Sequence, residues 1–395
     1  MQTPAVRKGM VAAFASASLL LSSACSSDAG SATGGKDASS PPANASSAPD
    51  ASSSPSAGLP PAKGSVDVVS TLTEDLASPW GLAALPGGDL LVASRDGATI
   101  SRIDGQSGRK TLLGSVPGVA PAGEGGLLGL AVAPTYGADH LVYAYFTTAS
   151  DNRVARLQYD EGRPAGQQLG APDTILRGIP KGSVHNGGRI AFGPDRMLYA
   201  GTGETGDTGL AQDKASLAGK ILRMTPDGEP VHGNPEADSV VYSYGHRNVQ
   251  GLAWDGDKRL WAAEFGQDTW DELNRIEPGK NYGWPDVEGR KGESGFVDPV
   301  AQWRTSEASP SGIAFARGSV WMAGLRGERL WRIPLSGTAD REPLAPPQAF
   351  LEGTYGRLRT VVAAGGDKLW VVTSNTDGRA TPKPGDDRIL LLKVR

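Results

Sequence analysis

The chain has 395 residues and a formal net charge of −4, a balance that offers no basic surface to nucleic acid and excludes that class of partner. Its 54 glycines and 9 tryptophans favour many short strands joined by tight turns. The single cysteine, Cys25, excludes an internal disulfide bond.

The first residues predict an export signal. Arg7 and Lys8 form a short basic region, and an apolar run follows from Met10 to Leu21. A run of about 12 residues is too short to span a bilayer as a mature helix. We therefore expect residues 1–24 to be a signal peptide.

The sequence around Cys25 resembles the lipobox of bacterial lipoproteins, in which the cysteine is lipidated and becomes the mature N-terminus. The small residue Ala24 precedes Cys25, although Ser22 stands where an aliphatic residue is usual. The resemblance implies an exported protein that is lipid-anchored to the outer face of the cell membrane. An ordinary secretory signal with an incidental cysteine is the alternative.

Residues 25–63 consist mainly of Ser, Ala, Pro, Gly and Asp, with almost no large apolar side chains. Such a segment cannot bury enough surface to offset the entropy lost on ordering, so it predicts a disordered tether. The tether would hold a folded domain, residues 64–395, away from a membrane surface.

Residues 64–395 contain six copies of one pattern: a short apolar strand, a turn of Gly, Asp or Pro, and a second apolar strand. This pattern is typical of a β-hairpin. The copies begin at Trp80, Leu128, Arg189, Gly251, Gly312 and Arg359. A further strand follows each hairpin, and in the first five copies we expect it to carry an outward-facing arginine. These arginines are Arg102, Arg156, Arg223, Arg275 and Arg332.

The spacing of the copies, roughly 47 to 62 residues, is close to the length of a propeller blade. The sequence therefore predicts an all-β, six-bladed β-propeller, with Val66–Ser70 adding a strand to the last blade. A β-sandwich is the competing architecture, but it does not predict six copies of one unit. Because propellers host both binding and catalysis, the loops must identify the function.

His185 best fits a catalytic base among the four histidines of the chain. It precedes the third hairpin, and Glu204 ends the partner strand nineteen residues later. A hairpin brings such positions together, so the carboxylate would bind one ring nitrogen and leave the other as a base. A loop histidine that binds backbone carbonyls is the alternative.

Two further polar groups flank the fourth hairpin. Arg247 and Asn248 offer a fixed cation and an amide, which suit a carboxylate or a quinone oxygen. An arginine that closes a blade through a salt bridge would look the same. Gly266 and Gln267, with the acidic residues that follow them, could supply oxygen ligands to a hard cation such as Ca²⁺. Acidic loop residues that are merely solvated are the alternative.

Three arginines, Arg326, Arg357 and Arg359, lie at equivalent loop ends in the fifth and sixth copies. Three cations that converge on one channel repel one another unless an anion joins them. We therefore expect an anionic partner in the channel.

Together these loops resemble the soluble PQQ-dependent glucose/aldose sugar dehydrogenases, which are glucose/sorbosone dehydrogenase-like propellers. The resemblance covers residues 66–395, and order and spacing fit across six blades. Its specific parts are Gly123–Gly129, His185 with Gly187–Arg189, Ser243–Asn248 with Gln250–Leu252, Asp271–Glu272, Asn281–Pro285, Ser309–Gly312 and Arg357–Arg359.

The resemblance implies a role for each matching position. His185 corresponds to the general base that takes the sugar hydroxyl proton as hydride leaves C1 for the quinone, and Glu204 to the acidic position behind it. Arg247 and Asn248 match the pair that contacts the quinone side of PQQ.

The cofactor ligands follow in the same way. Gly266 and Gln267 match the residues whose backbone carbonyls hold Ca²⁺. Arg326, Arg357 and Arg359 match basic residues that pair with the three carboxylates of PQQ. The implied partners are a small-molecule aldose, an electron acceptor that the sequence does not name and, through the lipid anchor only, a membrane.

Some positions depart from the family. Glu124, expected beside PQQ and the substrate, replaces a Gln of the glucose-active members, and Val184 replaces an acid. Gln267 replaces a Pro, and Arg326 stands where a Lys is common. These departures put glucose preference in doubt. A Ca²⁺-dependent lactonase, which needs several side-chain metal ligands, and a non-catalytic propeller that binds glycan or protein are the alternatives.

Overall fold

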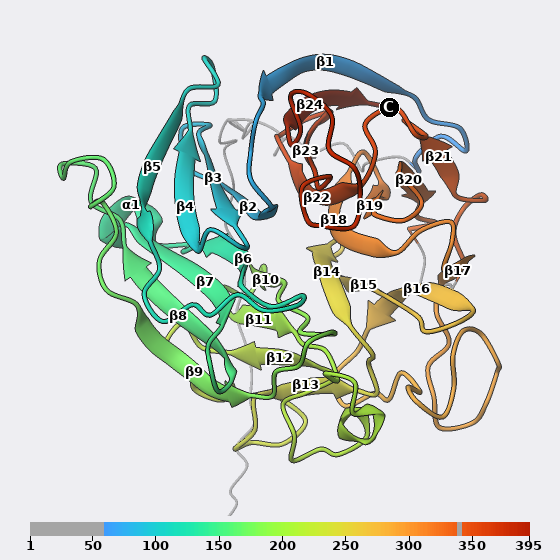
Figure 1. Cartoon of the computed structure of the whole chain (residues 1–395). Helices are drawn as coiled ribbons and strands as arrows, with labels where there is room; N and C mark the ends of the chain where they lie inside the picture. Colours follow the sequence, from blue (N-terminus) through green and yellow to red (C-terminus); the bar gives the residue numbers. More distant parts are fainter. Residues whose placement is uncertain (1–58, 338–341) are drawn as a thin grey trace, which may run out of the picture. The chain divides into compact units, whose positions relative to one another are not determined.

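A computed structural model describes residues 59–337 and 342–395. These residues form six four-stranded antiparallel sheets arranged around a common centre (Figure 1). The predicted six-bladed β-propeller is therefore confirmed. The predicted signal peptide, Cys25 and the tether up to residue 58 lie outside the described residues.

Each blade is built from strands that are consecutive in the chain, except the last, which also takes the first strand. The first three blades consist of β2 (Pro79–Ala84), β3 (Leu90–Ser94), β4 (Thr99–Ile103) and β5 (Lys110–Ser115); β6 (Leu127–Val132), β7 (Leu141–Thr147), β8 (Asn152–Gln158) and β9 (Asp173–Ile179); and β10 (Ile190–Phe192), β11 (Leu198–Gly201), β12 (Lys220–Met224) and β13 (Val241–Tyr244).

The other three blades consist of β14 (Val249–Trp254), β15 (Leu260–Glu264), β16 (Trp270–Ile276) and β17 (Ala301–Arg304); β18 (Pro310–Ala316), β19 (Ser319–Gly324), β20 (Arg329–Pro334) and β21 (Gln348–Phe350); and β22 (Leu358–Ala363), β23 (Lys368–Thr373), β24 (Ile389–Val394) and β1 (Val66–Thr73). One helical turn, α1 (Tyr136–Asp139), and one 3-10 turn, η1 (Thr208–Ala211), lie in the connections. Among the described residues, no helix is long and apolar enough to cross a membrane.

The ring closes by pairing the two ends of the described chain. Strand β1 runs antiparallel to β24, with Val66 opposite Val394 and Thr73 opposite Ile389, and Figure 1 shows the two strands side by side. This pairing confirms the prediction that Val66–Ser70 adds a strand to the last blade. It covers an edge of β24 that would otherwise present unpaired backbone groups.

The first strand of each blade lies innermost, where neighbouring blades approach most closely. A Cβ atom on Gly81 would lie 2.4 Å from the carbonyl oxygen of Leu128, and one on Gly251 would lie 2.4 Å from that of Ser311. Backbone therefore packs against backbone between these strands. This close approach explains why glycine recurs in the first strand of the repeated unit.

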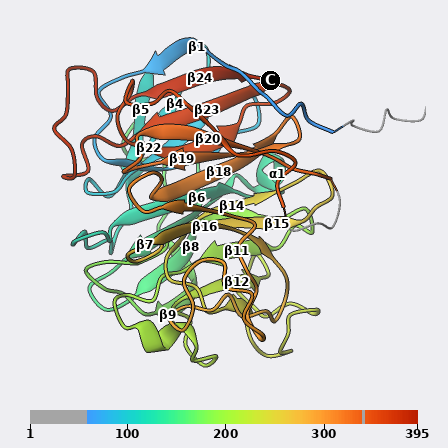
Figure 2. The same cartoon turned by 90° about the vertical axis from the view of Figure 1, so that its right-hand side faces the viewer.

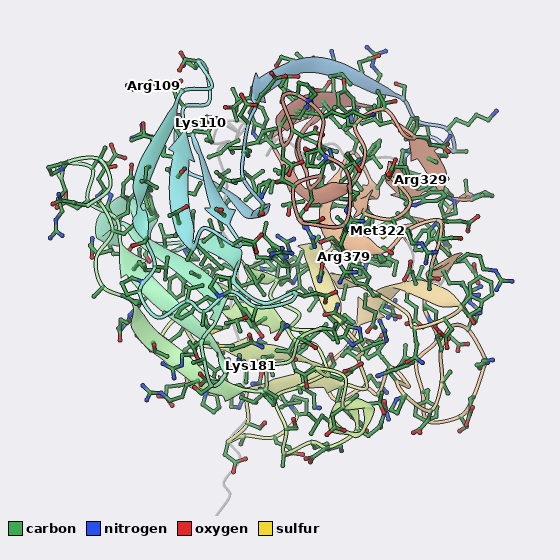
Figure 3. All side chains as sticks on the ribbon, in the orientation of Figure 1. Arg109, Lys110, Lys181, Met322, Arg329 and Arg379 are labelled. Atoms are coloured by element: carbon green, nitrogen blue, oxygen red, sulfur yellow. The ribbon has the colours of Figure 1, made fainter. Side chains whose placement is uncertain are left out.

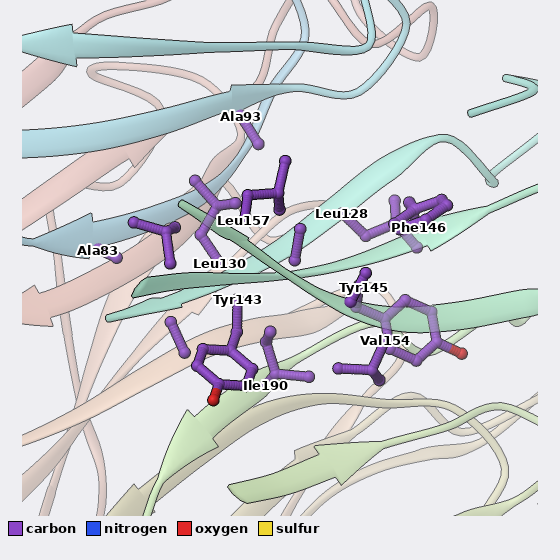
Figure 4. Packing of buried hydrophobic residues seen from close by; sticks show 14 of the residues in the cluster. Ala83, Ala93, Leu128, Leu130, Tyr143, Tyr145, Phe146, Val154, Leu157 and Ile190 are labelled. Atoms are coloured by element: carbon purple, nitrogen blue, oxygen red, sulfur yellow. The ribbon is translucent and has the colours of Figure 1, made fainter. Parts of the chain in front are cut away.

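Apolar side chains of adjacent blades form the core between the sheets. In the largest cluster, Leu128, Leu130, Tyr143 and Ile190 are all at least 97% buried and come from the second and third blades, as Figure 4 shows. From the side, loops project beyond the strands on both faces of the ring (Figure 2). Rigid sheets thus carry the loops that form the site.

The expectation of an outward-facing arginine is wrong for Arg332, which is fully buried. The segment before β1 covers it. Arg332 donates hydrogen bonds to the Pro61 carbonyl at 2.7 Å and to Gln348 Oε1 at 2.9 Å. The end of the predicted tether therefore packs on the fifth blade, where its backbone accepts a hydrogen bond from this guanidinium.

Candidate active site

A cavity of about 410 Å³ opens where the loops of several blades meet. In an antiparallel blade, the start of the first strand and the end of the second lie at the same edge. Loops that precede β6, β10, β14, β18 and β22 and loops that follow β3, β15 and β19 therefore line one cavity. Figure 3 shows Arg379, one of the lining residues, near the centre of the ring.

The cavity brings together most of the predicted site residues. Those that line it are Glu124, His185, Arg247, Asn248, Gly266, Gln267, Arg326, Arg357 and Arg359. Glu204 does not line it but lies behind His185, as the sequence predicts. The cavity wall also contains Trp80, Gln250, Asp271 and Ser309, which lie in motifs that the sequence showed, and Arg95 and Arg379, which no sequence motif indicated.

The hairpin brings His185 and Glu204 into contact. Glu204 is 1% exposed, and its Oε1 lies 2.8 Å from His185 Nδ1. Glu204 also accepts a hydrogen bond from the backbone N–H of Gly206, so its position is fixed. With Nδ1–H donating to the carboxylate, Nε2 carries the lone pair. No described residue forms a hydrogen bond with this Nε2, which suits it to accept a proton.

The backbone of His185 is held in an unusual conformation. Its φ is 51°, a left-handed value that only a few per cent of non-glycine residues adopt. The backbone N–H of His185 donates to Glu124 Oε2 at 2.9 Å, and that of Gly187 donates to Asn248 Oδ1 at 3.0 Å. The side chains of Glu124 and Asn248 therefore fix the backbone at His185 and two residues later at Gly187.

Arg247 packs over the indole ring of Trp284, with 5.5 Å between the guanidinium carbon and the ring centroid. Its Nη1 lies 3.4 Å from the Phe265 carbonyl, and its buried Nε has no partner among the described residues. Burial lowers the pKa of Arg247, and the negative charge of Glu204 is the largest influence that opposes this shift. No described carboxylate forms an ion pair with this side chain, so the alternative of a blade-closing salt bridge is wrong.

A buried hydrogen-bond network positions the backbone of Arg247. Ser243 Oγ lies 2.8 Å from His246 Nε2, and His246 Nδ1 lies 3.0 Å from Glu264 Oε1. These residue types resemble a hydrolase triad, but all three are at most 4% exposed, so no substrate reaches the serine. Glu264 Oε2 accepts the backbone N–H of Arg247 at 3.0 Å. The network therefore positions the strand start that carries Arg247.

The arginines of the sixth blade have an internal partner that the sequence analysis missed. Asp377 Oδ2 lies 3.0 Å from Arg357 Nη2 and 3.1 Å from Arg359 Nη2. Burial alone would raise the pKa of Asp377, but Arg359 and Arg357 outweigh burial and lower it. The inference that all three arginines need a foreign anion is therefore wrong for this pair. Arg326 is exposed and has no hydrogen bond or ion pair with a described residue.

The carboxylates of Asp271 and Glu272, which follow β15, accept hydrogen bonds from backbone N–H groups. Asp271 accepts the backbone N–H groups of Gly266 at 3.0 Å and Ser309 at 2.6 Å, and burial raises its pKa to about 7. Glu272 accepts the backbone N–H of Gly289 at 2.7 Å. Both carboxylates are therefore already engaged, and the prediction that they supply ligands is not supported.

The described residues contain no group of three or more His, Cys, Asp or Glu side chains suited to hold a metal ion. A lactonase with several side-chain metal ligands therefore has no counterpart here. The carbonyl oxygens of Gly266 and Gln267, in contrast, accept no hydrogen bond from any described residue. Both residues line the cavity, and carbonyl oxygens without partners fit a hard cation.

The side chains that line the cavity carry more positive than negative charge. Six arginines line it, against two carboxylates: the arginines are Arg95, Arg247, Arg326, Arg357, Arg359 and Arg379, and the carboxylates are Glu124 and Asp271. Arg379 pairs with Glu124 at 2.5 Å, Arg95 pairs with Asp96 at 2.7 Å, and Arg357 and Arg359 share the single negative charge of Asp377. The remaining positive charge favours a small polyanion.

Comparisons with known proteins agree with this geometry. The solved PQQ-bound aldose sugar dehydrogenase of Streptomyces coelicolor shares 74% sequence identity with this chain and superimposes with a TM-score of 0.84, covering 85% of this chain and 100% of that one. Aldose sugar dehydrogenase YliI of Escherichia coli K12 is 33% identical over 270 residues, 62% of this chain and 72% of that protein.

Quinoprotein glucose dehydrogenase B of Acinetobacter calcoaceticus is 29% identical over 289 residues, 64% of this chain and 59% of that protein. The glucose/sorbosone dehydrogenase family matches residues 76–389 of this chain. Since this match covers most of the chain, the protein belongs to the glucose/sorbosone dehydrogenase family.

Proposed function

We propose that this protein is a PQQ- and Ca²⁺-dependent dehydrogenase that oxidises the C1 hydroxyl of an aldose to a lactone. The observation that carries the proposal is the cavity, in which six arginines face two carboxylates and His185 offers a ring nitrogen without a partner. A cavity of this charge favours a ligand with several carboxylates. The PQQ-bound state of the Streptomyces coelicolor relative supports the same cofactor.

The arginines would hold PQQ through its carboxylates. Arg326 has no ion pair with a described residue, so it is free to bind the cofactor. Arg357 and Arg359 already pair with Asp377, and they would bind the cofactor as a second anion. Arg247 and Asn248 would contact the quinone side, and Glu124 would lie at the substrate end. PQQ, when bound, supplies the two-electron acceptor for the hydride that leaves the sugar.

The side chains of this protein perform the proton chemistry. His185 Nε2 takes the proton from the C1 hydroxyl, so the aldose loses one proton and one hydride in becoming the lactone. Glu204 keeps the imidazole in the required tautomer and stabilises its protonated form. Arg247 places a cation where negative charge develops, in a partly buried site where it needs no reorganisation.

The carbonyl oxygens of Gly266 and Gln267 would bind Ca²⁺, since this cation prefers oxygen ligands and accepts irregular geometry. The charge of Ca²⁺ would add to that of Arg247 at the same side of the cavity. Together they would favour an anionic cofactor there.

Export and lipid anchoring belong to the same proposal. The basic residues, the apolar run and Cys25 support a lipoprotein signal. Cell fractionation of the full-length protein tests it: the wild type should remain with membranes, and Cys25→Ala should be released. Equal distribution of the two proteins would argue against the anchor.

Reconstitution of the purified apo-protein tests the catalytic proposal. PQQ and Ca²⁺ are added together and singly, and dye reduction is followed with a panel of aldoses. We expect reduction only with both additions, and reduction about 10²- to 10⁴-fold slower with His185→Ala. If no sugar supports reduction and PQQ causes no absorbance change, the proposal fails. PQQ binding without reduction would point instead to a non-catalytic propeller.

A further inference from the structure

Glu288 lies between β16 and β17, and no role for it follows from the sequence. Its Oε1 accepts four consecutive backbone N–H groups, from Gln267 at 2.8 Å, Asp268 at 3.1 Å, Thr269 at 3.0 Å and Trp270 at 3.2 Å. Successive N–H groups that converge on one point form a concave anion-binding site. Here a carboxylate of the same chain fills it.

The direction of the carbonyl groups follows from these hydrogen bonds. In a trans peptide the C=O of one residue and the N–H of the next point in opposite directions, and neither peptide here is cis. The N–H groups of Gln267 and Asp268 point to Glu288. The carbonyl oxygens of Gly266 and Gln267 therefore point away from Glu288, and both residues line the cavity.

The preceding peptide follows the same rule. The N–H of Gly266 donates to Asp271 Oδ1 at 3.0 Å. Its peptide partner, the carbonyl of Phe265, faces Arg247 Nη1 at 3.4 Å. Two carboxylates thus hold the N–H edge of this loop, and three successive carbonyls lie on its opposite edge.

The loop has little freedom to relax. A Cβ atom on Gly266 would lie 1.9 Å from the Trp270 carbonyl oxygen, so the two ends of the loop touch. Glu288 is itself fixed, because the N–H of the next residue, Gly289, donates to buried Glu272 at 2.7 Å. Glu272 of the fourth blade thus fixes the segment that carries Glu288, and Glu288 in turn holds residues 267–270.

We propose that Glu288 is a positioning residue that orients the carbonyl oxygens of Gly266 and Gln267 toward the cation, through the backbone and not as a ligand. The inference rests on the proposed function, since it concerns the proposed Ca²⁺ site. Outer groups that orient metal ligands typically change metal affinity by about 10- to 100-fold when they are replaced. Glu288 would act in this way on backbone ligands.

The test compares the wild type with Glu288→Ala, Glu288→Gln and a control, Glu293→Ala, whose exposed side chain lies in the same connection. Hydrogen exchange of the 266–271 segment is measured in metal-free protein. Thermal unfolding is then followed as Ca²⁺ is titrated with PQQ present. For Glu288→Ala we expect faster exchange at residues 267–270 and a Ca²⁺ midpoint about 10- to 100-fold higher.

Glu288→Gln separates orientation from charge, because it keeps one carbonyl oxygen at the same reach but removes the negative charge. We expect it to lie close to the wild type in both measurements, as should Glu293→Ala. Equal losses in Glu288→Gln and Glu288→Ala with unchanged exchange would mean that only charge matters and would overturn the inference. Unchanged Ca²⁺ midpoints in both variants would also overturn it.

The wild type serves as the check on the proposed function. If Ca²⁺ does not shift the unfolding temperature of the wild type at any concentration, the protein does not bind Ca²⁺. The proposed Ca²⁺ site and the inference about Glu288 are then both wrong. If the wild type responds and Glu288→Ala responds equally, only the inference fails. A variant that does not fold is identified by its unfolding curve. If Glu288→Ala does not fold, Glu288→Asp, which keeps the charge but shortens the reach, decides the question: a higher Ca²⁺ midpoint supports the inference, and an unchanged midpoint overturns it.

Discussion

His185 Nδ1 lies 2.8 Å from Glu204 Oε1, and this contact sets which ring nitrogen can accept a proton. Glu204 is 1% exposed and does not line the cavity, whereas His185 does. A carboxylate in this position stabilises the imidazolium that forms during proton transfer. The pair therefore separates two tasks: one residue contacts substrate, and the other positions and supports it.

Replacing Glu204 should lower kcat without weakening the binding of PQQ. For Glu204→Gln we expect kcat to fall by about 10-fold or more and PQQ binding to be unchanged, whereas His185→Ala should lose about 10²- to 10⁴-fold in kcat. Steady-state kinetics and a PQQ absorbance titration measure both. Asp207→Asn, an exposed neighbour in the same turn, is the control. Wild-type kcat in Glu204→Gln would contradict the assigned role.

Arg247→Met should lose activity but keep the fold. The guanidinium has no ion pair with a described residue and its Nε has no hydrogen-bond partner, so little native bonding is removed. Loss of a preorganised charge at the reacting oxygen should lower kcat by about 10²- to 10³-fold. Kinetics and thermal unfolding are measured on the same preparation. A variant that unfolds at assay temperature would show that Arg247 is structural.

Asp377→Asn should destabilise the protein, because it leaves Arg357 and Arg359 buried without their shared anion. The expected loss is about 3–5 kcal/mol in the free energy of unfolding. Asp257→Asn, which breaks a surface pair with a 62% exposed carboxylate, should cost less than about 1 kcal/mol. Denaturant unfolding measures both variants.

The pH dependence of this effect has a definite sign. Since the folded-state pKa of Asp377 is lowered, its stabilisation is fully present above its unfolded pKa of about 3.9 and is lost as pH falls through the folded value. The stability difference between wild type and Asp377→Asn should therefore be constant near neutral pH and shrink below about pH 4. A difference that grows on acidification would contradict the pairing.

Arg379→Ala should change sugar preference more than stability. Its side chain is 56% exposed and pairs with Glu124, which also holds the backbone of His185. An exposed pair of this kind contributes about 1 kcal/mol or less to folding. We expect the ratios of kcat/KM across the aldose panel to change, because the pair lies in the cavity wall. Identical ratios in the variant would place the pair outside the substrate path.

Removal of β1 should weaken ring closure. A chain that begins at residue 59 keeps the pairing of Val66–Thr73 with β24, whereas one that begins at residue 74 leaves β24 as an unpaired edge. We expect the first to unfold at the wild-type temperature and the second to unfold at a lower temperature or to aggregate. Scanning calorimetry and light scattering measure the two. Equal stability would mean that β1 does not close the ring.

The sequence predicted those features that depend on short-range pattern. Six copies of an alternating strand-turn-strand unit were enough for the propeller, because side-chain alternation and turn residues are local properties. The contact between His185 and Glu204 was also predictable, since a hairpin relates the two positions directly. So was the added strand at Val66–Ser70, because ring closure requires a partner for the last blade.

Other relationships depended on loops whose paths the pattern does not determine. Asp377 reaches Arg359 across the connection between β23 and β24, and no local signal marked it. Glu288 folds back onto residues 267–270 from another connection, and the segment at Pro61 covers Arg332 from about 270 residues away in sequence. Each of these contacts offsets a buried charge or unpaired N–H groups.

The sequence by itself thus determined the blades, their order and most of the residues at the cavity wall. The tertiary structure alone decided which charges are already neutralised within the chain and which remain to meet a ligand. The physical reason is that strand pattern repeats at short range, whereas the electrostatic partner of a buried charge can come from any loop that the closed ring brings within reach.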